Sequence, residues 1–141
     1  MSNKIYIDAN VILDYCLDRI DKPNAKIIFD EINKGNLRGY MSGSIIHILS
    51  YFLEKIYGVE KTKEVILAII EDFEIIDMPK ELIIQALHSK MNDVEDALQY
   101  YVALHHKMDY FISNDQQLKK DSTSSLPVLG TGEFVNVFEL N

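Results

Sequence analysis

The sequence predicts a three-layer α/β fold, in which helices cover both faces of a central parallel sheet of four to five strands. Short apolar segments alternate with helical segments along the chain, and this alternation is typical of parallel sheets with helical crossovers. The 141 residues are enough for one hydrophobic core. No repeat, linker or low-complexity segment interrupts them, so we interpret residues 1–141 as a single domain.

The predicted strands are short runs of mainly apolar residues that end at polar or turn-forming residues. They span residues 4–7, 37–41, 74–77, 110–112 and 126–129. In an open parallel sheet the strands end at the same edge, and sites lie at that edge where the strand order reverses. The residues that follow each strand are therefore the first candidates for chemistry.

The predicted helices begin and end at residues that favour helix termini. Pro23 and Asn24 open one helix that Gly35 closes, and the turn before Ser44 precedes another that ends near Gly58. Asp93 is placed to cap a further helix. The predicted helices span residues 11–17, 23–34, 44–57, 60–72, 79–90 and 93–108, and a short terminal helix follows Thr131.

Composition and charge set the class of protein. Hydrophobic residues make up 48% of the chain and charged residues 26%, and no apolar run is long enough to span a bilayer. The first eight residues are too short and polar for a signal peptide, and the single Cys16 has no partner for an internal disulfide. We therefore expect a soluble protein in the reducing cytoplasm, without a membrane partner.

The formal net charge of −8 argues against a nucleic-acid partner, because phosphates favour basic proteins. The objection weakens if part of the negative charge binds a divalent cation, which inverts the local field. The question is therefore whether the carboxylates converge.

Two aspartates occupy equivalent positions at the ends of predicted strands. Asp8 directly follows residues 4–7, and Asp115 follows residues 110–112 after a short turn. Either one alone is explained by a turn or a helix cap, where Asp is common. Both together, each after an apolar strand, favour a shared crevice at the carboxyl edge of the sheet.

The helix after Asp93 brings further carboxylates. Asp93 and Asp96 are three residues apart and flank the predicted apolar face, whereas Glu95 is expected on the solvent side. Asp93 serves equally well as a helix cap, which makes Asp96 the better candidate for binding a cation. The predicted apolar face consists of Ala97, Tyr101, Leu104 and Met108.

Converging carboxylates suit Mg²⁺ or Mn²⁺, which prefer oxygen ligands. Such ions activate water and neutralise charge during phosphodiester hydrolysis. The sequence has no phosphate-binding glycine loop and no HExxH motif. We expect Cys16 in the core. Apart from His47, we expect the histidines to be surface or packing residues. They are His88, His105 and His106.

Three segments of the sequence resemble the signature segments of PIN domains. They are Ile-Asp8-Ala-Asn10-Val-Ile-Leu-Asp, Asn92-Asp93-Val-Glu-Asp96-Ala-Leu and Phe-Ile-Ser113-Asn114-Asp115. Their order and separation fit the family over essentially the whole chain. The second segment is similar to the bacterial branch that includes VapC-type toxins.

The resemblance implies a Mg²⁺- or Mn²⁺-dependent endoribonuclease with RNA as its substrate. It also implies the toxin part of a toxin–antitoxin system, with an antitoxin protein as partner and a homodimer as the assembly. By position, the catalytic metal ligands would be Asp8, Asp96 and Asp115. The supporting residues near the site would be Asn10, Ser44, Asp93 and Asn114.

One position departs from the family pattern. PIN domains usually carry a Glu early in the helix that follows the second strand, and His47 is the matching residue here. The predicted core face of that helix consists of Ile45, Ile48, Leu49, Phe52 and Ile56. His47 lies on the opposite side, so we expect it either in the cleft or in open water. Imidazole suits Mn²⁺ better than Mg²⁺, so a replaced Glu predicts weakened Mg²⁺ affinity.

Two other interpretations stay open. His47 and the acidic balance favour a degenerate PIN module that binds RNA or a protein partner without cleavage. A receiver-like phosphoacceptor domain is disfavoured, because the chain lacks a paired acidic cluster after the first strand and a Lys at the end of a late strand. Lys119 and Lys120, just beyond Asp115, are candidates for contacts to RNA phosphates.

Overall fold

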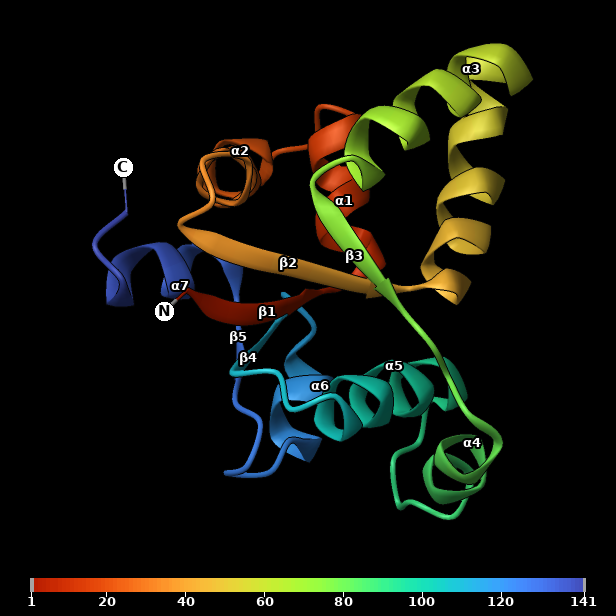
Figure 1. The fold of residues 1–141 in the computed structure, drawn as a ribbon, viewed down its shortest axis with the longest axis vertical. Coiled ribbons are helices and arrows are strands. Elements are labelled where there is room, and N and C mark those ends of the chain that lie inside the picture. The colour runs from red at the N-terminus through yellow and green to blue at the C-terminus, as the bar shows by residue number, and fades with distance from the viewer. Residues whose placement is uncertain (1, 141) are drawn as a thin grey trace.

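The computed structural model, which describes residues 2–140, has a five-stranded parallel sheet at its centre (Figure 1). The strand order is β3-β2-β1-β4-β5, and every pairing is parallel. The predicted α/β class is therefore confirmed, with five strands. The strands are β1 (Asn3–Ile7), β2 (Leu37–Ser42), β3 (Phe73–Ile76), β4 (Tyr110–Ile112) and β5 (Val128–Leu129).

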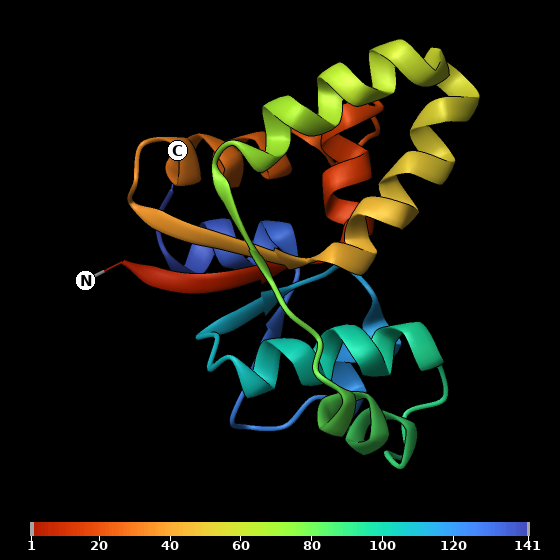
Figure 2. The ribbon, with the colours of Figure 1, turned by 45° about the vertical axis from the view of Figure 1, so that its right-hand side comes forward.

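Helices cover both faces of the sheet, as Figures 1 and 2 show. One layer contains α1 (Ala9–Cys16), α2 (Lys22–Asn33), α3 (Gly43–Ile70) and α7 (Thr131–Val137). The other contains α4 (Lys80–Leu87), α5 (Val94–His105) and α6 (Gln116–Asp121). The short terminal helix that the sequence predicts after Thr131 is α7.

Each helical layer buries its own core against the sheet. Ile5 and Ile7 of β1 face the first layer, where they pack in a cluster with Ile12, Ile28 and Leu49. Tyr6 faces the second layer and packs in a cluster with Tyr100, Phe111, Leu118 and others. Alternate residues of one central strand thus join both cores, which is why β1 reads as an unbroken apolar run.

The strand order reverses beside β1. From β1 the chain passes through α1 and α2 to β2 on one side, and it returns through α5 to β4 on the other side of β1. The residues after β1 and β4 therefore meet at the point where ligands bind in open α/β sheets. These residues include Asp8 and Asp115.

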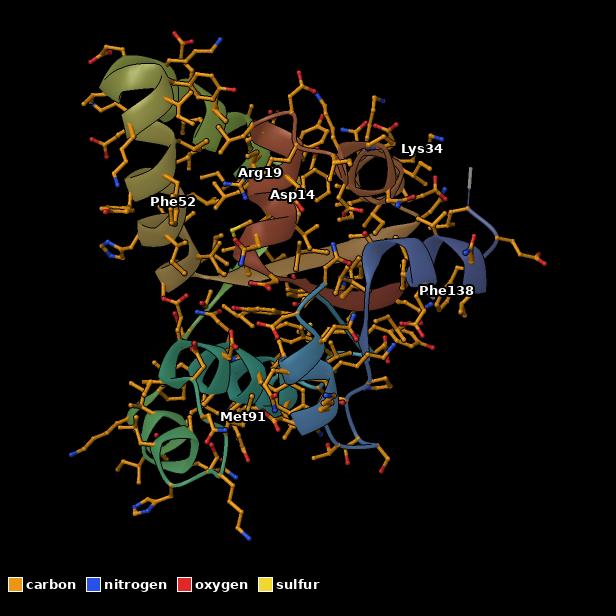
Figure 3. All side chains as sticks on the ribbon, turned by 180° about the vertical axis from the view of Figure 1, so that it is seen from behind. Asp14, Arg19, Lys34, Phe52, Met91 and Phe138 are labelled. Carbon is orange, nitrogen blue, oxygen red and sulfur yellow. The ribbon has the colours of Figure 1, made fainter. Side chains whose placement is uncertain are left out.

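Helix α3 differs in part from its predicted core face. Ile45, Leu49 and Leu53 are fully buried, whereas Phe52 is 40% exposed and Ile56 is 63% exposed. The prediction for Phe52 and Ile56 was therefore wrong. This end of the helix rises away from the sheet and is covered on one side only (Figure 3, where Phe52 is labelled).

The predicted break near Gly58 is confirmed. Gly58 has φ 77° and ψ 172° within α3, where the chain turns into a second arm. A left-handed φ favours glycine, so this residue permits the bend. The two predicted helices are one element with a kink.

Helix α5 is buried more broadly than its predicted stripe. The buried residues are Ala97, Gln99, Tyr100, Val102 and Ala103, whereas Tyr101 and Leu104 are only partly buried. The helix lies between the sheet and α4, so two of its sides are covered. Met108, expected on this helix, follows it and is buried at the start of the loop to β4.

Across residues 2–140, no helix combines the length and the apolar character that crossing a membrane requires.

Candidate metal centre

Asp8 and Asp115 are joined through a buried serine. The Ser113 hydroxyl donates a hydrogen bond of 2.8 Å to Asp8 Oδ2 and accepts one of 3.1 Å from the Asp115 backbone N–H. Ser113 is 2% exposed. Strands β1 and β4 pair in parallel with Ile7 opposite Ile112, so the residues that follow the two strands are held side by side.

Burial raises the pKa of the Asp8 carboxyl above its ordinary value, and the Asp115 carboxylate acts in the same direction. The hydrogen bond from Ser113 opposes this shift. Asp8 occupies the N-cap position of α1, but its side chain makes no capping hydrogen bond there. The backbone N–H groups of Asn10 and Ala9 are nonetheless close enough to lower the pKa of this carboxyl, in opposition to burial.

Asp93 and Asp115 both cap helices. Asp93 accepts a bond of 2.9 Å from the Asp96 backbone N–H at the start of α5. Asp115 Oδ1 accepts bonds of 2.9 and 3.1 Å from the N–H groups of Gln117 and Leu118 at the start of α6. The capping role expected for Asp93 is thus present. Both α5 and α6 begin at the carboxyl edge of the sheet.

The pKa of the Asp96 carboxyl is also raised. Burial and, in decreasing order, the carboxylates of Asp93, Asp115, Asp8 and Glu95 together raise its pKa to about 7. Carboxylates that follow β1 and β4 thus lie within electrostatic reach of those at the start of α5. Glu95 is exposed as predicted, yet burial and the charges of Asp93 and Asp8 raise its pKa as well.

Within the part of the chain that the structure describes, no basic side chain pairs with these carboxylates. Within residues 2–140, none of the carboxylates of Asp8, Asp93, Asp96 and Asp115 forms an ion pair with Lys, Arg or His. An uncompensated, partly buried carboxylate is costly unless a cation meets it. The chemistry of the donor set, oxygens alone, fits a hard divalent cation.

The carboxylates do not form a closed ligand set in this conformation. Over the described part of the chain, no three acidic, His or Cys side chains surround a common point at metal-binding distances. A pocket of about 250 Å³ is lined by Asp8, Asn10, Val11, Asp14, Asn114 and Asp115. Asp96 does not line it, so the pocket brings together two of the three predicted ligands.

Asn114 supports the pocket through a network that the sequence does not reveal. Its Nδ2 donates to Asp21 Oδ2 at 3.0 Å, and its Oδ1 accepts from the Thr131 backbone N–H at 2.9 Å. Thr131 Oγ1 donates to the same Asp21 oxygen at 2.7 Å. A Cβ at Gly130 would lie 2.9 Å from Asn114 Oδ1, so a larger residue there would displace the Asn114 amide. Asn114 therefore ties the end of β4 to α2 and α7.

The pocket has an ion pair at its rim. Asp14 lines the pocket from α1, and its Oδ1 lies 3.4 Å from Arg19 Nη1 (Figure 3). Asn10 lines the same pocket and is exposed. Asp14 belongs to the first motif but was not predicted as a site residue. Its side chain faces the pocket because it lies one turn of α1 beyond Asn10 and Val11.

Ser44 and His47 lie on the first two turns of α3. Ser44 Oγ accepts a bond of 2.6 Å from Gln99 Nε2 and lies 2.7 Å from Ser42 Oγ, which ties the start of α3 to α5. His47 is exposed, one helical turn beyond Ser44. It does not line the pocket at Asp8.

The two lysines beyond Asp115 lie on α6. Lys119 Nζ is 2.6 Å from Glu133 Oε1, so this ammonium group is held against α7. Lys120 is exposed, and it forms no ion pair within residues 2–140.

Comparison with known proteins identifies the family. The family model described as PIN domain matches residues 4–117, which include Asp8, Asp93, Asp96 and Asp115. The chain belongs to the PIN domain family. No curated protein sequence matches this PIN domain.

Solved structures share its fold, and 18 of their chains match. A chain of VapBC2 from Rickettsia felis, crystallised with a DNA fragment from their promoter, superposes with a TM-score of 0.70 at 13% identity. The match covers 90% of this chain and 98% of that one. PAE2754 from Pyrobaculum aerophilum gives a TM-score of 0.69 at 15% identity, with coverage of 99% and 97%. The PIN-like fold is thus confirmed, and it is shared with a chain of VapBC2.

The raised pKa of Asp96 predicts how the stability of this PIN domain depends on pH. Its carboxyl binds a proton more tightly in the folded state, with a pKa of about 7, than in the unfolded chain, near 3.8. The free energy of unfolding of the metal-free protein therefore falls as pH rises through this window. Urea denaturation should show that Asp96→Asn stabilises the protein more at about pH 8 than at about pH 5. An equal effect of Asp96→Asn at both pH values would contradict the assignment.

Proposed function

We propose that this PIN domain is a metal-dependent endoribonuclease that hydrolyses RNA phosphodiester bonds. The observation that carries the proposal is the group of carboxylates that follow β1 and β4 and begin α5, at the switch point of the sheet. Burial and these neighbouring charges raise the pKa of Asp96 to about 7, and none of these carboxylates has a basic partner within residues 2–140. Mutual repulsion of this kind is relieved by a divalent cation. The three signature segments of the sequence support the same activity.

Asp8, Asp96 and Asp115 would hold a Mg²⁺ or Mn²⁺ ion. When bound, such an ion supplies an activated water and neutralises the charge that develops at the phosphorus. Ser113 holds the Asp8 carboxylate in place by its hydrogen bond. Asp93 fixes the first turn of α5, from which Asp96 projects.

The substrate contacts would come from α6 and the edge of the pocket. Lys120 is exposed on the helix that Asp115 caps, so its ammonium group is available to RNA phosphates. Lys119 would contribute only after leaving Glu133. With a net charge of −8, the protein needs the cation to make the pocket attractive to RNA.

We further propose the role of a toxin that an antitoxin protein restrains, with the toxin as a homodimer. This rests on the similarity of the motifs to VapC-type toxins and on the fold shared with a chain of VapBC2. The alternative is a PIN module that binds RNA or a partner without cutting. His47 favours this alternative, because an imidazole at this position takes the place of the anionic Glu that PIN domains usually carry.

Replacement of one carboxylate distinguishes a metal-dependent nuclease from a module that binds RNA without cutting it. Asp96→Asn should reduce Mn²⁺-dependent cleavage of a mixed RNA pool at least about a hundredfold, because it removes one charged group from the reacting centre. EDTA should abolish cleavage by the wild type. Asp30→Asn is the matched control, since Asp30 pairs with Lys26 on α2, away from the pocket. Binding of RNA without cleavage by the wild type would favour the non-catalytic module.

The metal preference tests the role of His47. Isothermal titration of the wild type should show tighter binding of Mn²⁺ than of Mg²⁺, because imidazole suits Mn²⁺ better. His47→Glu should restore Mg²⁺ affinity and narrow the difference between the two ions. Equal, tight binding of both ions by the wild type would show that His47 takes no part in the site.

A further inference from the structure

A closed hydrogen-bond network lies behind the candidate metal centre. Gln99 of α5 is 4% exposed, and it is the one polar residue among the five buried residues of this helix. Its Oε1 accepts hydrogen bonds from the Tyr6 hydroxyl and from Ser42 Oγ, the latter at 3.1 Å. Its Nε2 donates to Ser44 Oγ at 2.6 Å. One side chain thus joins α5 to β1, β2 and the start of α3.

The protons of this network can be assigned so that each is used once. Tyr6 donates to Gln99 and accepts from the Ser42 backbone N–H at 3.2 Å. Ser42 donates to Gln99, and Ser44 donates to Ser42 across 2.7 Å. Every hydroxyl then has a donor and an acceptor role, as buried hydroxyls require. The amide of Gln99 is the group that closes the ring.

The network lies beside two of the proposed metal ligands. Gln99 follows Asp96 by three residues, so both project from the same side of α5. Tyr6 of β1 precedes Asp8 by two residues, and the backbone at Asp8 is still extended just beyond the strand, so both side chains point to the same side of the sheet. The advance along α5 is about 4.5 Å, and that along β1 is about 6.6 Å. Because Gln99 contacts Tyr6, Asp96 and Asp8 are placed opposite each other, each one step closer to the carboxyl edge of the sheet than the contacting pair.

Apolar packing alone does not set this register. Tyr100, Val102 and Ala103 seat α5 on the sheet, but hydrophobic contacts are not directional and tolerate sliding or rotation of a helix. Hydrogen bonds are directional, and a buried one is costly to break. Figure 2 shows α5 lying across the face of the sheet opposite α1 and α3, with its first turn toward the carboxyl edge.

We propose that Gln99 is a positioning residue of the metal centre, whose amide fixes the register of α5 on β1 and β2 and thereby places Asp96 relative to Asp8. The inference rests on the proposed metal site, and it adds a residue that touches neither metal nor RNA. Gln99 acts through Asp96, so its loss weakens metal binding in a protein that is still folded.

The experiment measures Mn²⁺ affinity by isothermal titration in wild type, Gln99→Met and Val102→Ala, at a temperature where circular dichroism shows all three folded. Gln99→Met keeps the length of the side chain and removes the amide. Val102 is fully buried on the same helix outside the network, so Val102→Ala loosens α5 without breaking the ring. Gln99→Met should weaken Mn²⁺ binding by about tenfold, as expected for residues that orient metal ligands. Val102→Ala should stay within about twofold of wild type.

The outcomes separate the two proposals. Wild-type affinity in Gln99→Met, or an equal loss in Val102→Ala, overturns the positioning role and leaves the metal site intact. No Mn²⁺ binding by the wild type overturns both. If Gln99→Met does not fold, Ser44→Ala takes its place, because it removes only the acceptor of Gln99 Nε2 and the donor to Ser42. It should weaken Mn²⁺ binding in the same direction, and an unchanged affinity contradicts the role.

Discussion

Repulsion among carboxylates at the switch point of the sheet is the constraint on which the rest of the structure depends. Asp8 and Asp115 follow adjacent parallel strands, and Asp96 lies near them at the start of α5, on one face of the sheet. A chain free to relax would move these groups apart. The parallel register of β1 and β4 prevents this, because moving either aspartate would break pairs such as Ile7 with Ile112 in the centre of the core.

The surrounding structure offsets this repulsion with dipoles instead of cations. Helices α1, α5 and α6 all begin at the carboxyl edge of the sheet, directly after Asp8, Asp93 and Asp115. A helix N-terminus carries a partial positive charge, which stabilises nearby anions by roughly 0.3–1 kcal/mol each. Ser113 adds a hydrogen bond to Asp8. These contributions hold the carboxylates in place and leave their charge available to a divalent cation.

Sequence patterns predicted the features of the fold that depend on neighbouring residues in the chain. The strand at Tyr110–Ile112, the break at Gly58 and the cap at Asp93 depend on a few neighbouring residues, and all are present. The short helix α6 that Asp115 caps was not predicted. The exposure of Phe52 and Ile56 could not be predicted, because it depends on how far the arm of α3 extends beyond the sheet.

The supporting residues of the site were missed for a related reason. Ser113, Gln99 and Asp21 act through partners 93 to 105 positions away or on other elements, and no local pattern pairs them. No sequence pattern indicated Gln99, because the predicted apolar face of its helix leaves out this buried polar residue. Such a residue asks for a buried partner, and the partner's identity comes only from the fold.

The most direct test of this account is a crystal structure of the protein grown with Mn²⁺, with anomalous diffraction data to locate the metal. The account predicts a peak in the anomalous map within ligand distance of the Asp8 and Asp115 carboxylates, with Asp96 drawn toward it. Absence of a peak at these carboxylates, with Mn²⁺ bound only elsewhere on the surface, would contradict the central claim.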